Sequence, residues 1–247
     1  MRILAIYNIK GGVGKTAAAV NLAHTASQQG QRVLLWDLDP QGASSYYFRV
    51  KARVKGGTAE LLKKNNRLQR AIKGTDYPRL DLIPADFSYR NLDLALDDRD
   101  PSRRRLGKLL HRLDGDYDLI LLDCPPSVSM LSENVLHAAA ALLVPLIPTN
   151  LSLRAYKQLR RFSKEMAPGE TRLLPFFSMV DRRRKLHREV VTDFAHRHDN
   201  LLRSYIPYSS IVEQMGAHRA PVTDFAPRSE PARAYRQLWD EINIRAG

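Results

Sequence analysis

The chain has 247 residues, of which 44% are hydrophobic and 26% are charged, the composition of a globular protein large enough to bury a full core. No apolar run approaches the roughly 18–20 residues of a membrane-spanning helix, and the single cysteine, Cys124, excludes an internal disulfide and a zinc site made of cysteines. Lysine and arginine number 39 against 26 acidic residues, so the formal net charge is +13 and the partner we expect first is a polyanion, nucleic acid before an anionic membrane surface.

Strand-like runs alternate with helix-like runs along the whole chain, which predicts an α/β fold: a mostly parallel twisted sheet with helices on both faces. The first strand is expected over residues 2–8 and leaves no room for a signal peptide, so we expect a cytoplasmic protein. A helix is expected over residues 16–29, ended by Gly30. A buried strand that ends in acids is expected over residues 32–40.

The later elements continue the alternation. Strands are expected over residues 79–85, 118–126, 141–148, 172–180 and 201–208, and helices over residues 152–167 and 230–244. Because no linker, low-complexity segment or internal repeat interrupts them, we expect one domain over residues 1–247. Residues 49–73 are the hardest to interpret: they hold nine basic residues and one acid, Glu60, and form either a solvated face or part of a polyanion-binding surface.

The loop after the first strand reads NIKGGVGKT (Asn8–Thr16) and nearly fits the phosphate-loop pattern G-x-x-x-x-G-K-[ST]. Gly14, Lys15 and Thr16 match it, but Ile9 stands where the first glycine is expected, and a second lysine, Lys10, follows. Backbone N–H groups from residue 11 to residue 16 predict an anion-binding nest at a helix N-terminus. Lys15 is expected on the β- and γ-phosphates, and the Thr16 hydroxyl on Mg²⁺.

Acidic residues at strand ends support the same site. Asp123 ends the apolar run LILLD, the Walker B arrangement that holds Mg²⁺. Asp37 and Asp39 end the strand after the loop helix, and their spacing predicts that both point to one side of that strand. Since ligands of an open parallel sheet gather at the carboxyl ends of its strands, we expect the three acids to converge on the loop.

At these residues the sequence resembles the ParA/MinD family of deviant-Walker ATPases. KGGVGKT, DLDPQG and LLDCPPS match its three nucleotide motifs in order and spacing, and residues 178–191 resemble the segment that follows the strand near the adenine. The resemblance covers most of the chain and thins between Arg49 and Lys108. It implies the cofactors ATP and Mg²⁺. The residues expected to bind the nucleotide are Gly11, Gly12, Val13, Gly14, Lys15, Thr16, Ala17, Met179, Asp181 and Pro207.

The resemblance also gives a role to the second lysine. In this family the signature lysine, here Lys10, reaches across a homodimer to the phosphates bound by the other subunit, as an arginine finger does. Asp39 matches the family's catalytic aspartate, which positions the attacking water. Lys10, Lys15 and Asp39 are therefore the expected catalytic residues, and Thr16, Asp37 and Asp123 the expected metal residues.

Several branches of this family differ in features that the sequence shows. One cysteine excludes the iron–sulfur branch, and the tyrosine cluster of the kinase branch is absent. A MinD-like membrane-cycling ATPase needs a C-terminal amphipathic anchor, but the spacing of Tyr235, Leu238, Trp239 and Ile242 favours core packing instead. A metabolic ATP-dependent ligase stays open, although it gives no reason for the basic charge.

The branch that fits best is the short ParA type, which hydrolyses ATP, binds nucleoid DNA without sequence preference and positions a cargo. The cargo is a plasmid, a chromosome or a protein assembly such as a bacterial microcompartment, and a cargo-associated partner protein stimulates hydrolysis. Non-specific DNA binding rests on phosphate contacts by Lys and Arg. The candidate DNA-binding residues are Arg182, Arg183, Arg184, Lys185, Arg188, Arg219, Arg228, Arg233, Arg236 and Arg245.

Overall fold

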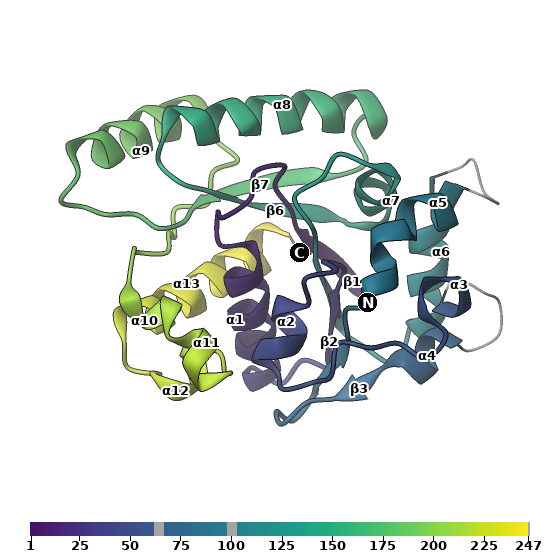
Figure 1. The fold of residues 1–247 in the computed structure, drawn as a ribbon. Helices are drawn as coiled ribbons and strands as arrows, with labels where there is room; N and C mark the ends of the chain where they lie inside the picture. The colour runs from purple at the N-terminus through teal and green to yellow at the C-terminus, as the bar shows by residue number, and fades with distance from the viewer. Residues whose placement is uncertain (62–66, 98–102, 247) are drawn as a thin grey trace.

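The computed structural model describes residues 1–61, 67–97 and 103–246. The sheet in this part of the chain has seven strands in the order β3-β4-β2-β5-β1-β6-β7 (Figure 1). All neighbouring strands pair in parallel except β3 and β4, which are antiparallel. The strands are β1 (Arg2–Ile6), β2 (Val33–Asp37), β3 (Lys73–Gly74), β4 (Leu80–Ile83), β5 (Leu119–Asp123), β6 (Ala141–Leu146) and β7 (Arg172–Phe177). The predicted α/β class and mostly parallel sheet are confirmed.

Alternation along the central strands divides the core into two layers, one on each face of the sheet. In β1, Ile3 and Ala5 face one layer while Leu4 and Ile6 face the other, because successive side chains of a strand point to opposite faces. Both sets are apolar, as expected for a parallel sheet that is covered on both sides.

Helices cover both faces of the sheet, as predicted. The first layer packs against α6 (Arg105–Leu110), α7 (Met130–Ala138), α8 (Asn150–Met166) and α9 (Lys185–Arg197), and the second against α1 (Lys15–Gln28) and α13 (Glu230–Arg245). The remaining short helices are α2 (Ala43–Tyr47), α3 (Gly57–Leu61), α4 (Arg67–Ala71), η1 (Phe87–Asn91), α5 (Leu92–Asp97), η2 (His111–Leu113), α10 (Ser210–Glu213), α11 (Met215–His218) and α12 (Val222–Phe225). Figure 1 shows α8 and α9 along one edge of the molecule, and α10–α12 at the far end of α13.

The last helix packs into the core, as its spacing predicted. Tyr235, Leu238, Trp239 and Ile242 of α13 are all buried in the second layer, beside α1. Its apolar side is therefore covered by the protein itself. None of the helices in the described part of the chain is long and apolar enough to cross a membrane.

The strand expected over residues 201–208 is wrong. The segment runs beside β7, and Leu202 N donates to Pro175 O at 2.8 Å, but the pairing is limited to an isolated bridge between Val180 and Pro207. The N–H groups of Arg203 and Ser204 donate instead to the carboxylate of Glu241 on α13, at 2.7 and 2.8 Å. A side chain thus takes the backbone groups that a strand ladder needs.

Candidate nucleotide-binding site

The phosphate loop connects β1 to α1 at the carboxyl end of the sheet. Gly12 and Gly14 have φ values of 70° and 87°, a left-handed conformation that glycine adopts without steric cost. A Cβ on Gly14 would also lie 2.9 Å from Ser178 Oγ, so the Ser178 side chain would have to shift to admit it. No side chain caps the N-terminus of α1 in the described structure. The first N–H groups of this 14-residue helix consequently face the loop, an arrangement suited to an anion.

The two lysines of the loop lie in different environments. Lys15 is 7% exposed, and its Nζ donates to the backbone oxygen of Lys10 at 3.2 Å. Burial lowers the pKa of Lys15, and the nearby carboxylates of Asp123 and Asp39 partly oppose this shift. Lys10 is half-buried, and its N–H donates to Asn8 Oδ1 at 2.9 Å, which fixes the loop where it leaves β1.

Asp37 and Asp123 lie opposite each other at the ends of β2 and β5, where their Cα atoms are paired in register. Both are buried, and each has one carboxylate oxygen, Oδ1, that is buried without a hydrogen-bond partner. Burial raises the pKa of Asp37 to about 6 and that of Asp123 to about 7, and for Asp123 the neighbouring Asp37 adds to the rise. Two desolvated carboxyl groups side by side form a strong site for a cation.

Ser44 and Ser45, at the start of α2, hold these carboxyl groups and were not among the predicted residues. The Ser44 hydroxyl donates to Asp123 Oδ2 at 2.8 Å. Both the hydroxyl and the N–H of Ser45 donate to Asp37 Oδ2, at 2.7 and 2.8 Å. The available signal was the pair of serines just after DLDPQGA, since a serine at a helix start often bonds a neighbouring group.

Asp39 lies beyond the strand. β2 ends at Asp37, so the expectation that both acids stand on one strand is wrong. Asp39 is half-buried in the following turn, where its Oδ1 accepts from Gln41 N at 3.0 Å. It still lies close enough to act on the pKa of Lys15 and of Asp123.

The remaining predicted nucleotide residues fall into two groups. Thr16 neighbours Asp123 and lowers the pKa of that carboxyl, Val13 is fully buried, Ala17 is half-buried and Gly11 is exposed beside Pro126. After β7, Met179 has a φ of 57° and its side chain reaches Gly14, while Pro207 bridges to Val180 next to it. The structure therefore brings Met179 to the phosphate loop and Pro207 beside Met179.

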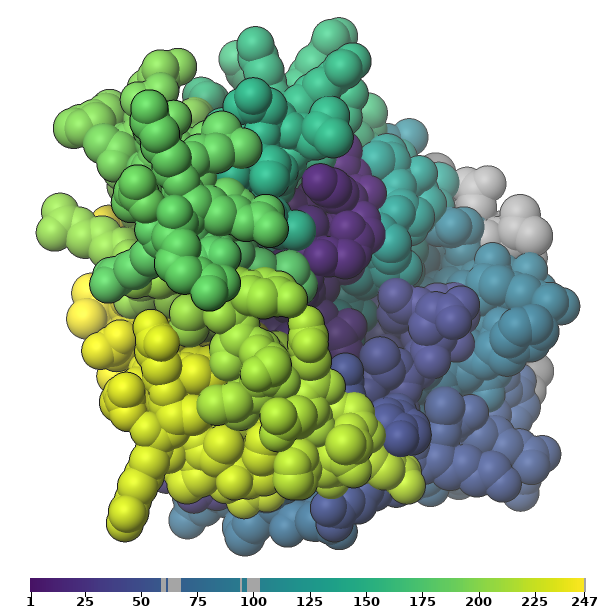
Figure 2. All heavy atoms as spheres, turned by 60° about the vertical axis from the view of Figure 1, so that its left-hand side comes forward, coloured from purple at the N-terminus to yellow at the C-terminus, as the bar shows by residue number. Residues whose placement is uncertain are grey.

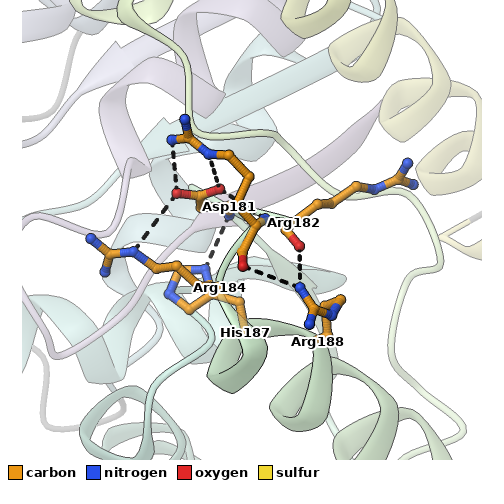
Figure 3. A network of polar contacts seen from close by, with 6 residues as sticks. Asp181, Arg182, Arg184, His187 and Arg188 are labelled. Carbon is orange, nitrogen blue, oxygen red and sulfur yellow. Dashed lines mark hydrogen bonds and ion pairs between the residues drawn. The ribbon is translucent and has the colours of Figure 1, made fainter.

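Asp181 belongs to a polar network at the start of α9 (Figure 3). Arg183 donates to both of its carboxylate oxygens at 3.0 Å, Arg184 lies 3.7 Å away, and the Asp181 N–H donates to His187 Nδ1 at 3.0 Å. These bonds, led by those from Arg183, lower the pKa of Asp181 to about 2. The carboxylate is thus occupied by arginines of its own loop.

The predicted DNA-binding residues lie near both ends of the C-terminal third, and several of them are already bonded. Arg188 donates to Arg182 O at 2.6 Å, and Lys185 pairs with Glu189 at 3.6 Å. Arg236 donates to Pro227 O and Arg245 to Asp199 O, each at 2.6 Å, while Arg233 donates to Arg228 O. Arg219 stacks over the Tyr46 ring, 4.6 Å from its centre, and bonds Tyr46 O.

One surface hollow joins two of the predicted arginines that are distant in sequence. Arg182 and Arg233 line a hollow of about 340 Å³ together with Arg203, a residue that sequence reasoning missed. Figure 2 shows the N-terminal segment in purple between a green segment from the later part of the chain and a blue segment that follows β2.

The chain has relatives along nearly its whole length. A family model described as an AAA domain matches residues 1–172. The chromosome partitioning protein ParA of Caulobacter vibrioides is 33% identical over 253 residues, which cover 99% of this chain and 95% of that protein. The sporulation initiation inhibitor protein Soj of Bacillus subtilis is 31% identical, over 98% of each chain.

Solved structures agree with these sequence matches. The cobyrinic acid a,c-diamide synthase of Mycobacterium smegmatis, with bound ATP analog and magnesium, has a TM-score of 0.84 at 30% identity, over 99% of this chain and 94% of that one. The phosphate loop, the two strand-end carboxyl groups and these relatives lead to one conclusion: the chain belongs to the ParA/MinD family of P-loop ATPases.

Proposed function

We propose that this protein is a ParA-type ATP hydrolase that dimerises on ATP, binds nucleoid DNA without sequence preference and positions an intracellular cargo. One observation carries the proposal: two buried carboxyl groups, each with an unbonded oxygen, stand beside a phosphate loop that holds two lysines. We propose that the protein acts in the cytoplasm, where it associates with the nucleoid. A plasmid, a chromosome or a protein assembly is the cargo, through a partner protein that stimulates hydrolysis.

The residues present fit a magnesium nucleotide. Asp37 and Asp123 each offer one buried carboxylate oxygen without a hydrogen-bond partner, and the Thr16 hydroxyl and phosphate oxygens would complete the set of ligands around Mg²⁺. Bound Mg²⁺ neutralises charge on the phosphates. The backbone N–H groups of residues 11–17 and the Lys15 ammonium would bind the phosphates, and Met179, Asp181 and Pro207 would bind the base.

Lys10 and Asp39 supply the catalytic step in this proposal. Lys10 contributes a cation to phosphates that a second copy of the chain binds, so ATP joins two subunits. Asp39, half-exposed in its turn, holds the attacking water through the carboxylate oxygen that Gln41 N leaves free. Arg182, Arg219 and the other predicted arginines contact DNA phosphates.

The proposal is tested by mass in solution and by ATP turnover. The unmodified chain should be a dimer with ATP and a monomer with ADP. Lys15→Ala should lose nucleotide binding, whereas Lys10→Ala should bind ATP but fail to dimerise or hydrolyse it. Asp39→Ala should lower turnover by about 100-fold or more and accumulate the ATP dimer. A Lys10→Ala variant that dimerises and hydrolyses ATP normally would contradict the assignment.

A second candidate function comes from the likeness to the diamide synthase structure at 30% identity. An ATP-dependent ligase of this kind would turn over ATP only with a small acid substrate and would not respond to DNA. A MinD-like membrane function is disfavoured because Tyr235, Leu238, Trp239 and Ile242 of α13 are buried, which leaves Ile244 as its exposed large apolar residue. Sedimentation with anionic liposomes at high salt, with ATP and with ADP, distinguishes it, since the ParA-type proposal predicts no ATP-dependent binding that survives the screening of charge.

A further inference from the structure

A second basic surface lies away from the arginines predicted to bind DNA. It begins after α2, where cations alternate along residues 49–55 (RVKARVK). Arg49, Lys51, Arg53 and Lys55 are exposed, while Val50 is half-buried and Val54 is buried. The segment is irregular, with Arg49 at a φ of 59° and a tight turn in which Arg53 N donates to Lys51 O at 2.8 Å. Its valines anchor it to the protein while its cations face solvent.

The segment borders a hollow of about 580 Å³ between α3, α4 and the start of β3. An adjoining hollow of about 510 Å³ shares most of its lining and extends to Lys51 and Arg53. The floor is apolar and belongs to the core, and the rim carries Lys55, Arg70 and Lys73. We call this hollow and its rim the basic groove; it is lined by Val50, Lys51, Arg53, Val54, Lys55, Gly56, Leu61, Arg70, Ala71 and Lys73. Lys63 and Lys64 lie outside the described residues.

Most of the cations on the rim form no ion pair with a carboxylate of the described residues. Arg49 pairs with Asp76 at 3.4 Å, and Arg53 lies near Asp86, whose pKa it helps to lower. Lys51, Lys55, Arg70 and Lys73 form no ion pair with any described carboxylate. Like charges held together without counterions raise the local positive potential and attract an anion.

The segment that borders the basic groove also contacts the residue next to Arg219, one of the C-terminal arginines predicted to bind DNA. Arg49 Nη2 donates to the backbone oxygen of His218 at 3.2 Å. Arg219, which follows His218, stacks on the ring of Tyr46, three residues before Arg49. Figure 2 shows the yellow-green C-terminal segment against the blue segment after β2. One surface therefore carries cations from Arg219 across Arg49 to Lys51.

We propose that the basic groove binds the phosphate backbone of the same DNA duplex, as a second contact region beyond the C-terminal arginines. The inference rests on the proposed DNA binding and goes beyond it by assigning the residues that line the basic groove to it. Continuity with Arg219 favours DNA over an acidic protein segment. Lysine contacts to phosphates carry no sequence information, in keeping with non-specific binding.

The test replaces the three unpaired lysines of the groove: Lys51→Gln, Lys55→Gln and Lys73→Gln in one variant. A matched control removes three exposed cations from α8, at the opposite edge of the molecule: Arg154→Gln, Lys157→Gln and Lys164→Gln. A third variant keeps the groove charge with Lys51→Arg, Lys55→Arg and Lys73→Arg. The affinity for duplex DNA of random sequence is measured with ATP at several salt concentrations.

Each phosphate contact that is lost lowers the slope of log affinity against log salt by about 1. We expect the magnitude of this slope to fall by about 1 to 3 in the groove variant and to stay unchanged in the α8 and Lys→Arg variants. An unchanged slope in the groove variant would overturn the proposal that the groove binds DNA, and so would an equal loss in the α8 control. Loss of binding to polyglutamate with an unchanged DNA slope also overturns it, in favour of an acidic protein. By contrast, an unmodified chain that binds DNA equally with ATP and ADP overturns the proposed function.

Discussion

At the scale of single residues, Ser44 and Ser45 decide how the carboxyl groups of the site are held. Each serine bonds one oxygen of a buried aspartate and leaves the other oxygen unbonded. The unbonded oxygens are therefore fixed in direction before any ligand arrives, which lowers the cost of ordering the site.

Ser44→Ala tests this role. It removes the hydroxyl that bonds a buried carboxyl group, so we expect a loss of about 1–3 kcal/mol in the free energy of unfolding and weaker binding of magnesium nucleotide. Ser27→Ala is the control, because Ser27 is also buried but bonds His24 O within α1. Urea unfolding and nucleotide titration with and without Mg²⁺ measure both effects. Equal losses of magnesium-dependent affinity in the two variants would contradict the role of Ser44.

The carboxyl pair also predicts a pH dependence. Burial raises the pKa of Asp37 to about 6 and of Asp123 to about 7, above the ordinary 3.8. From about pH 4 to pH 7 the folded chain keeps protons that the unfolded chain releases, so this contribution makes the free energy of unfolding fall as pH rises. Asp123→Asn removes one titrating group, so the free energy of unfolding of this variant should fall less steeply between about pH 4 and pH 7 than that of the unmodified chain. Urea unfolding without nucleotide or Mg²⁺ measures it; parallel curves for the two proteins would refute the account.

The sequence predicted the residues that would contact the nucleotide better than the residues that hold them in position. The loop glycines, Lys15 and the strand-end acids could be located because their spacing is set by local backbone geometry. Ser44 and Ser45 could not, because their partners depend on which strands are neighbours. Asp39 was placed on the strand because alternation alone does not show where pairing stops.

At the scale of elements, the segment 201–208 shows where periodicity fails. Its apolar residues are buried as those of a strand would be, at Leu202 and Ile206. Pairing nevertheless depends on free backbone N–H groups, and Glu241 of α13 accepts two of them. A contact between distant parts of the chain thus overrides the local pattern.

Glu241→Ala should release these two N–H groups. Because the bonds involve a charged acceptor but are partly exposed, we expect a loss of about 1–2 kcal/mol in the free energy of unfolding. Asp240→Ala is the control, since Asp240 bonds one exposed side chain, Gln29. Thermal and urea unfolding compare the two. A control that loses as much stability as Glu241→Ala would show that the anchoring of this segment is unimportant.

At the scale of the whole molecule, both core layers are built on one sheet. We infer that residues 1–247 form one domain, as the sequence predicted, and a single cooperative transition on unfolding would check this. The formal charge of +13 is spread along the chain, and two of its cationic regions, the C-terminal arginines and the basic groove, meet at Arg49 and Arg219. Composition predicted the excess charge, but only the fold shows which cations adjoin.

The central claim is that ATP controls DNA binding. The most direct measurement is the affinity of the unmodified chain for duplex DNA of random sequence with ATP, with ADP and without nucleotide, each at several salt concentrations, beside Lys15→Ala. We predict tight, salt-dependent binding with ATP alone, and weak binding by Lys15→Ala in all three states. Equal DNA affinity of the unmodified chain in the three states would contradict the claim.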